Sequence, residues 1–124
     1  MKIESFRDLN IWKLGKEIVL DTYKITKSFP EFEKFGLTSQ IQRAAVSITS
    51  NIAEGFGRQS YKEKVQFYYL AHGSMTEVKN QLILSRDLKY ITDKDFDGAL
   101  EKLISSQRLL QGLIRASKKF FGDK

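Results

Sequence analysis

The sequence has no cysteine, one histidine and one proline among its 124 residues. Without cysteine the chain can form no disulfide and offers no thiol nucleophile, a composition that fits a reducing compartment. The single histidine, His72, excludes a zinc site of histidine and cysteine within one chain. No Glu-x-x-His pair is present, which argues against a carboxylate-bridged dimetal centre in a helical bundle. We therefore expect neither a metal nor a cofactor.

Long apolar runs are also missing. No stretch approaches the roughly 20 apolar residues that a membrane-spanning helix needs, and residues 1–10 lack the apolar stretch of a signal peptide. We expect a cytoplasmic protein that does not contact a membrane. The length suits one core, and no internal repeat or low-complexity tract divides the chain, so we expect a single domain over residues 1–124.

Positive charge and helical periodicity are what the chain has in abundance. The net charge is +6 and the isoelectric point about 9.5, which favours polyanionic partners. Apolar residues recur at steps of three and four, which predicts helices over residues 6–28, 37–53, 60–89 and 92 or 93–119. Pro30 ends the first helix, and Gly55 and Gly57 are expected to leave the second with positive φ. Because the linkers are short, the predicted fold class is all-α, an up-down-up-down antiparallel four-helix bundle.

The second predicted helix carries a narrow polar stripe between apolar residues. At 100° per residue its members fall on one side: Gln40, Arg43, Ser47, Asn51 and Glu54. One interpretation is a solvated edge. The other is a hydrogen-bonded seam between helices or subunits, with Arg43 and Glu54 as its charged members. Glu77 of the third helix is expected to project toward the interior, where a buried carboxylate needs a partner such as Arg43.

The third predicted helix is apolar on two sides. Its main inner face is expected to comprise Phe67, Leu70, Ala71, Ser74, Val78 and Leu88. A thinner stripe on the far side suggests a self-association surface made of Val65, Tyr69, His72 and Ile83. The alternative is a set of scattered surface apolar residues, which are common in soluble proteins. Gly73 and Ser74, in mid-helix, fit the close approach of another backbone.

Three stretches carry a resemblance to a known family: FRDLNIWKLGKEIV at residues 6–19, GLTSQIQRAAVSITSNIAEGFGR at residues 36–58 and YLAHGSMTEV at residues 69–78. The second stretch contains a long signature, GLxxQxxRAxxSxxxNIAEG. On these residues the chain resembles the 23S ribosomal RNA intervening-sequence proteins, or S23 family, over nearly its whole length.

The resemblance implies a four-helix bundle that assembles into a ring, a homopentamer, with RNA or DNA as a suspected partner. Some relatives serve as basic accessory subunits of a retroelement reverse transcriptase. No catalytic residue is carried over to this chain. His72 stands where arginine is common in the family, which weakens any role assigned to a cation there.

Basic residues gather at one end of the predicted bundle, where the starts of the first and third helices and the C-terminus meet. Six of them are candidates for nucleic-acid binding: Arg58, Lys62, Lys64, Arg115, Lys118 and Lys119. In a ring with parallel axes they would form a basic rim suited to phosphate backbones, and the nearby Tyr61 and Phe56 could stack on unpaired bases. The plainer interpretation is a solvated first turn and C-terminal charges that match a helix dipole.

Nothing in the sequence marks an enzyme. No nucleophile stands with a positioned base, and the stretch from Gly55 to Gly57 lacks the Lys-Ser/Thr pattern of a phosphate loop. No RRM or KH signature is visible. Two hypotheses remain. One is a basic homo-oligomer that holds RNA or DNA, for example for a partner enzyme, and the other is a protein-interaction scaffold whose basic charge meets an acidic protein surface. Only the first predicts affinity for nucleic acid that falls log-linearly with salt.

Overall fold

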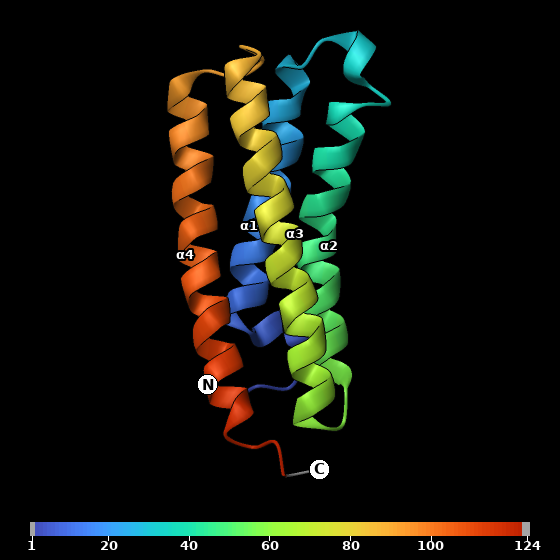
Figure 1. Ribbon diagram of the computed structural model, residues 1–124, viewed down its shortest axis with the longest axis vertical. Helices are drawn as coiled ribbons and strands as arrows, with labels where there is room; N and C mark the ends of the chain where they lie inside the picture. The colour runs from blue at the N-terminus through green and yellow to red at the C-terminus, as the bar shows by residue number, and fades with distance from the viewer. Residues whose placement is uncertain (1, 123–124) are drawn as a thin grey trace.

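The computed structural model describes residues 2–122, in which four long helices run side by side (Figure 1). They are α1 (Asn10–Ile25), α2 (Leu37–Gly57), α3 (Tyr61–Asp87) and α4 (Asp93–Lys118). Short 3₁₀ helices occupy Phe6–Asp8, Thr26–Ser28 and Glu31–Glu33, and residues 2–122 contain no strand. Each long helix contacts two others, in the pairs α1–α2, α2–α3, α3–α4 and α1–α4. The predicted up-down-up-down bundle is confirmed.

Side-chain caps fix where the chain enters its helices. Ser5 and Asp8 form a capping box at the 3₁₀ turn that precedes α1, and the Asp8 carboxylate accepts from the backbone N–H groups of Glu4 and Ser5 at 2.9 and 3.0 Å. These two bonds hold the pKa of Asp8 below its usual value. The hydroxyls of Ser60 and Thr92 accept from backbone N–H groups at the starts of α3 and α4.

The core is a continuous apolar cluster contributed by all four helices. Its fully enclosed side chains recur at helical spacing: Ile41, Ile48 and Ile52 in α2, Met75, Val78 and Leu82 in α3, and Leu103 and Leu110 in α4. Ile11 and Ile18 supply the contribution of α1. Because each helix has one such stripe, all four can bury it around a common axis.

The second helix is longer than predicted. It runs to Gly57 rather than ending near Ala53, and neither Gly55 nor Gly57 has positive φ. Gly55 is required for a different reason, because a Cβ there would lie 2.7 Å from Cε1 of Tyr68 and 3.1 Å from the carbonyl oxygen of Lys64. The glycine therefore allows the end of α2 to touch the start of α3, and the turn itself uses extended backbone at Arg58 and Ser60.

The buried side of α3 differs from the predicted one. Its core residues include Val65, Tyr68, Met75 and Leu82, whereas Leu70 and Leu88 of the predicted inner face are exposed. Phe67 is partly exposed, and only Ala71, Ser74 and Val78 of that face are buried. Since apolar residues surround much of this helix, the pattern alone defined the buried direction poorly.

The predicted self-association stripe is therefore wrong for two of its four members. Val65 lies in the core, and Ile83 is partly buried and packs against it. His72 is half-buried, with its Nε2 3.5 Å from the side-chain nitrogen of Gln111 on α4. Tyr69 alone is exposed, at 50%. Val65, His72 and Ile83 therefore form an inner edge of α3 rather than a free stripe.

Within residues 2–122, no helix combines the length and the apolar character that crossing a bilayer would demand.

Candidate nucleic-acid interface

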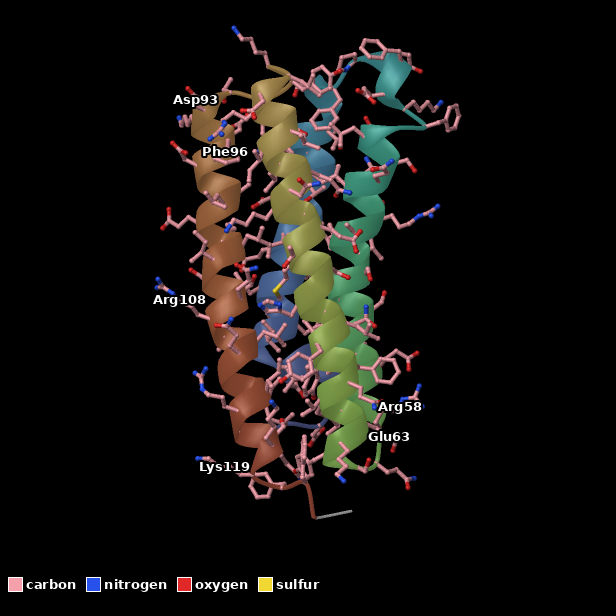
Figure 2. All side chains as sticks on the ribbon, in the orientation of Figure 1. Arg58, Glu63, Asp93, Phe96, Arg108 and Lys119 are labelled. Carbon is pink, nitrogen blue, oxygen red and sulfur yellow. The ribbon has the colours of Figure 1, made fainter. Side chains whose placement is uncertain are left out.

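The start of α1, the end of α4 and the α2–α3 turn lie at one end of the bundle (Figure 1). Figure 2 labels Arg58 and Lys119 at this end and Asp93 at the opposite end. Lys62 and Lys64 belong to the first turn of α3, and two further cations to the last turn of α4. We call the six predicted cations the basic pole: Arg58, Lys62, Lys64, Arg115, Lys118 and Lys119. The structure brings together residues from sequence positions about 60 apart.

Lys64 has a structural role at the basic pole. Its ammonium donates to the carbonyl oxygen of Phe56 at 2.6 Å and lies 5.4 and 5.9 Å from the ring centroids of Phe56 and Tyr61. Partial burial lowers the pKa of Lys64. The side chain thus satisfies a carbonyl in the last turn of α2, and its charge is only partly available to a ligand.

Arg58 is also occupied within the chain. Its guanidinium pairs with the Glu54 carboxylate at 3.2 Å and lies 4.5 Å from the ring centroid of Phe67. Both charged side chains are substantially exposed, so a phosphate could displace Glu54 at small cost. Arg58 therefore contributes a cation that is already oriented, but partly neutralised.

Aromatic rings alternate with the remaining cations of the basic pole. The ammonium of Lys118 lies 5.1 Å from the ring centroid of Tyr69. Tyr61 packs on Phe120 with ring centroids 5.1 Å apart, so part of its face is already covered. Tyr69 and Phe120 are both about half exposed. Cations beside exposed rings provide contacts for phosphates and for unpaired bases on one surface.

The other three cations have no such engagement. Lys62, Arg115 and Lys119 are exposed, and within residues 2–122 none of them forms an ion pair. They are the cations of the basic pole whose charge is fully available to a ligand.

The sequence did not point to Tyr68, which supports this end from beneath. It is buried against Gly55, and burial raises the pKa of Tyr68 to about 12. The phenol therefore stays neutral in the physiological range. The only signal for this contact was the glycine itself, which the sequence interpretation had assigned to a turn.

The predicted polar seam divides into two parts. The side-chain nitrogen of Asn51 donates to the backbone carbonyl and hydroxyl oxygens of Ser47 at 2.9 and 3.0 Å, and the hydroxyl of Ser74 on α3 donates to that of Ser47 at 2.9 Å. This part joins α2 to α3, as the seam interpretation predicted.

The charged part of the predicted seam lies on the surface. Gln40, Arg43 and Glu54 are exposed, and so is Glu77. The expectation of a buried Glu77 paired with Arg43 is wrong: no ion pair joins the two, since α3 is turned so that Glu77 faces outward.

Comparison with known proteins connects this architecture to a family. The sequence model described as 23S rRNA-intervening sequence protein matches residues 7–112. The chain belongs to that family. A crystal structure of a protein of unknown function from the S23 ribosomal protein family of Bacteroides thetaiotaomicron VPI-5482 has the same fold, with a TM-score of 0.78 and 23% identity over 84% of this chain and 97% of the other. No curated protein matches the chain.

The family match covers the basic pole only in part. In this 23S rRNA-intervening sequence protein, residues 7–112 include Arg58, Lys62 and Lys64 but end before the three cations of α4. Of those three, Lys118 is tied to the matched part of the chain by its contact with the ring of Tyr69. Among residues 2–122, no group of three or more histidine, aspartate and glutamate side chains is arranged to hold a metal ion.

Proposed function

We propose that this 23S rRNA-intervening sequence protein is a non-enzymatic homo-oligomer that binds the backbone of RNA or DNA through the basic pole. The observation that carries the proposal is the meeting, at one end of the bundle, of cations from the end of α2, the start of α3 and the end of α4. The net charge of +6 gives the same preference for polyanions.

The arrangement suits contacts with phosphates more than the reading of bases. Flexible lysines release counterions when they neutralise phosphates, which gives affinity with little sequence preference. The half-exposed rings of Tyr69 and Phe120 can stack on unpaired bases of any identity. Single-stranded or looped nucleic acid is therefore the favoured ligand.

Self-association would strengthen this binding. Copies arranged around an axis parallel to the helices would place several basic poles on one rim, and their fields would add. The subunit number of five rests on the family resemblance alone.

Fluorescence anisotropy with a labelled single-stranded RNA of mixed sequence tests the proposal. We expect log-linear loss of affinity as salt rises. The triple variant Lys62→Glu, Arg115→Glu, Lys119→Glu should bind at least tenfold more weakly, with a salt slope shallower by about 2. The matched control, Lys24→Glu, Lys27→Glu, Lys94→Glu, makes the same charge change toward the other end and should bind within about twofold of wild type. Absence of binding to assorted RNA and DNA at low salt would reject the proposal.

A second candidate function has its own observation. Phe32 and Phe35, in the α1–α2 connection at the end opposite the basic pole, are 79% and 90% exposed. Phosphate binding gives no reason for two exposed phenylalanines, whereas a protein-interaction scaffold does. In that case, replacing both phenylalanines with serine should abolish binding of a partner protein and should leave RNA binding unchanged.

A further inference from the structure

Three exposed leucines line one side of α3. Leu70, Leu84 and Leu88 are 56%, 45% and 52% exposed. Their spacing places them on one side of the helix together with Gly73 and Glu77. This side borders α2, because the neighbouring Ser74 bonds to Ser47 of α2. A row of leucines beside an outward polar stripe marks a surface suited to another protein surface.

Gly73 interrupts this row without any reason within the chain. It is exposed in mid-helix, and a Cβ built on it meets nothing within 4 Å. Glycine weakens a helix relative to alanine, so its presence calls for an explanation. A residue without a side chain allows another backbone to come close, and the space beside Gly73 is left open by this chain.

Two opposite charges on the same surface lack a partner. Arg43 and Glu77 are both exposed, and neither forms an ion pair within residues 2–122. Arg43 lies four residues before Ser47, and Glu77 lies three residues after Ser74. Because α2 and α3 are antiparallel, both lie on the same side of the Ser47–Ser74 contact, about 6 Å and about 5 Å from it along the axis. The two charges thus stand at nearly the same height.

We propose that this surface is where copies of the chain associate, with Arg43 of one copy paired to Glu77 of the next. We call it the α2/α3 face: Gln40, Arg43, Ser47, Asn51 and Glu54 of α2 with Leu70, Gly73, Glu77, Leu84 and Leu88 of α3. Rotation about an axis parallel to the helices leaves heights unchanged, so α2 of one copy meets α3 of its neighbour with these charges opposed. Burial of the leucines would then be accompanied by charge pairing. The inference supplies the contact for the self-association in the proposed function.

The other exposed apolar set does not make the same case. Leu20 and Tyr23 on α1, and Ile104 and Leu109 on α4, are also exposed. Between these helices, however, Lys102 is already paired with Asp21 and Glu17 of its own chain. The α2/α3 face, by contrast, carries the opposite charges of Arg43 and Glu77, which form no ion pair within residues 2–122.

Charge exchange tests the pairing directly, with the mass of the full-length protein measured by light scattering at micromolar concentration. Wild type should be larger than a monomer. Arg43→Glu or Glu77→Arg alone should raise the dissociation constant at least tenfold, and the double variant Arg43→Glu, Glu77→Arg should restore assembly. Arg108→Glu is the matched control, because Arg108 points away from the bundle on α4 (Figure 2); it should leave the mass unchanged. Circular dichroism checks that each variant is folded.

The absence of native cysteine permits a second test. The variant carrying both Arg43→Cys and Glu77→Cys should form covalent oligomers on a non-reducing gel, whereas either substitution alone should not. A disulfide closed within one chain would leave a covalent monomer and contradict the proposal. So would a monomeric wild type, or a double charge exchange that assembles no better than the single variants. Variants of the basic pole should retain wild-type mass, so failure of RNA binding and failure of this interface are distinguishable.

Discussion

The two sides of the bundle differ in how completely the chain satisfies its own polar groups. Between α1 and α4, the Lys102 ammonium lies 2.7 Å from the Asp21 carboxylate and 3.6 Å from that of Glu17. Between α2 and α3, Arg43 and Glu77 stand exposed without ion pairs inside residues 2–122. Lys102 thus joins α1 to α4 by ion pairs, whereas no ion pair joins α2 to α3 within residues 2–122.

The same contrast extends below the surface. Of the buried side-chain atoms in residues 2–122, one lacks a hydrogen-bond partner, and it is Oε1 of Gln81 on α3. Buried polar atoms without partners are rare because each costs free energy. The helix that carries the unpaired Glu77 therefore also carries the unsatisfied acceptor.

The largest expected effect tests which side of α3 is inside. Leu82 is fully buried and Leu70 is exposed, although the periodicity favoured Leu70. Leu82→Ala should lower the free energy of unfolding by about 3 kcal/mol, through lost burial and the cavity left behind. Leu70→Ala should cost at most about 0.5 kcal/mol in the monomer. Urea denaturation at a concentration where wild type is monomeric gives both values; equal costs would mean that α3 is turned differently.

A smaller effect is expected where α2 and α3 touch. Gly55→Ala should cost about 2 kcal/mol, since the new Cβ overlaps the ring of Tyr68. Gly57 has open space and no positive φ, so Gly57→Ala should be neutral or stabilise by up to about 1 kcal/mol. Thermal unfolding of the two variants separates a packing requirement from a turn requirement. Similar losses of stability at both positions would mean that the two glycines are required by the turn, as the sequence suggested.

The sequence correctly predicted the buried side of a helix where the apolar residues lie on one side only. For the fourth helix the periodicity predicts six core positions, Phe96, Leu100, Leu103, Leu110, Leu113 and Ile114. Four of them are buried, and Leu100 and Leu113 are partly buried and pack against the core. The third helix offered apolar residues in several directions, so its buried side depended on contacts with α2 that no single-helix pattern encodes. The sequence showed Ser47 in a polar stripe of the second helix, but it did not show that the hydrogen-bond partner of Ser47 is Ser74 of α3.

For the candidate site, the sequence predicted where the basic residues lie better than it predicted which of them are free to bind a ligand. All six cations of the basic pole belong to helix turns at one end, as the topology required. That Lys64 bonds to a carbonyl and Arg58 to Glu54 depends on side-chain geometry at the α2–α3 turn. Charge counting treats all six as equal, whereas within residues 2–122 four of them, Lys62, Arg115, Lys118 and Lys119, form no ion pair and no bond to a carbonyl.

The unsatisfied acceptor of Gln81 gives the next prediction. Gln81→Leu removes the buried oxygen with little change in volume and should stabilise the protein by about 1 kcal/mol. Ser85→Ala is the contrasting variant, because the Ser85 hydroxyl donates to the backbone carbonyl oxygen of Gln81 at 2.6 Å and not to its side chain; it should be neutral or slightly destabilising. If Gln81→Leu instead destabilises in urea titrations, the oxygen has a donor from water or from a second copy.

The smallest effect is expected for the ion pair between Lys102 of α4 and Asp21 of α1. The hydrogen bond from Lys102 to the Asp21 carboxylate raises the pKa of Lys102 above its usual value, although desolvation opposes the shift. A raised pKa in the folded state means that the contribution to stability is complete below the unfolded pKa and is lost as pH rises through the folded one. Lys102→Met should therefore cost less than about 1 kcal/mol near neutral pH, because the pair is partly exposed. The difference from wild type should be constant at neutral pH and should shrink as pH rises through the raised folded-state pKa of Lys102, where the ammonium loses its charge. Chemical denaturation at pH 7, 9 and 11 measures this difference, and a cost independent of pH would assign the role of Lys102 to its methylene groups rather than its charge.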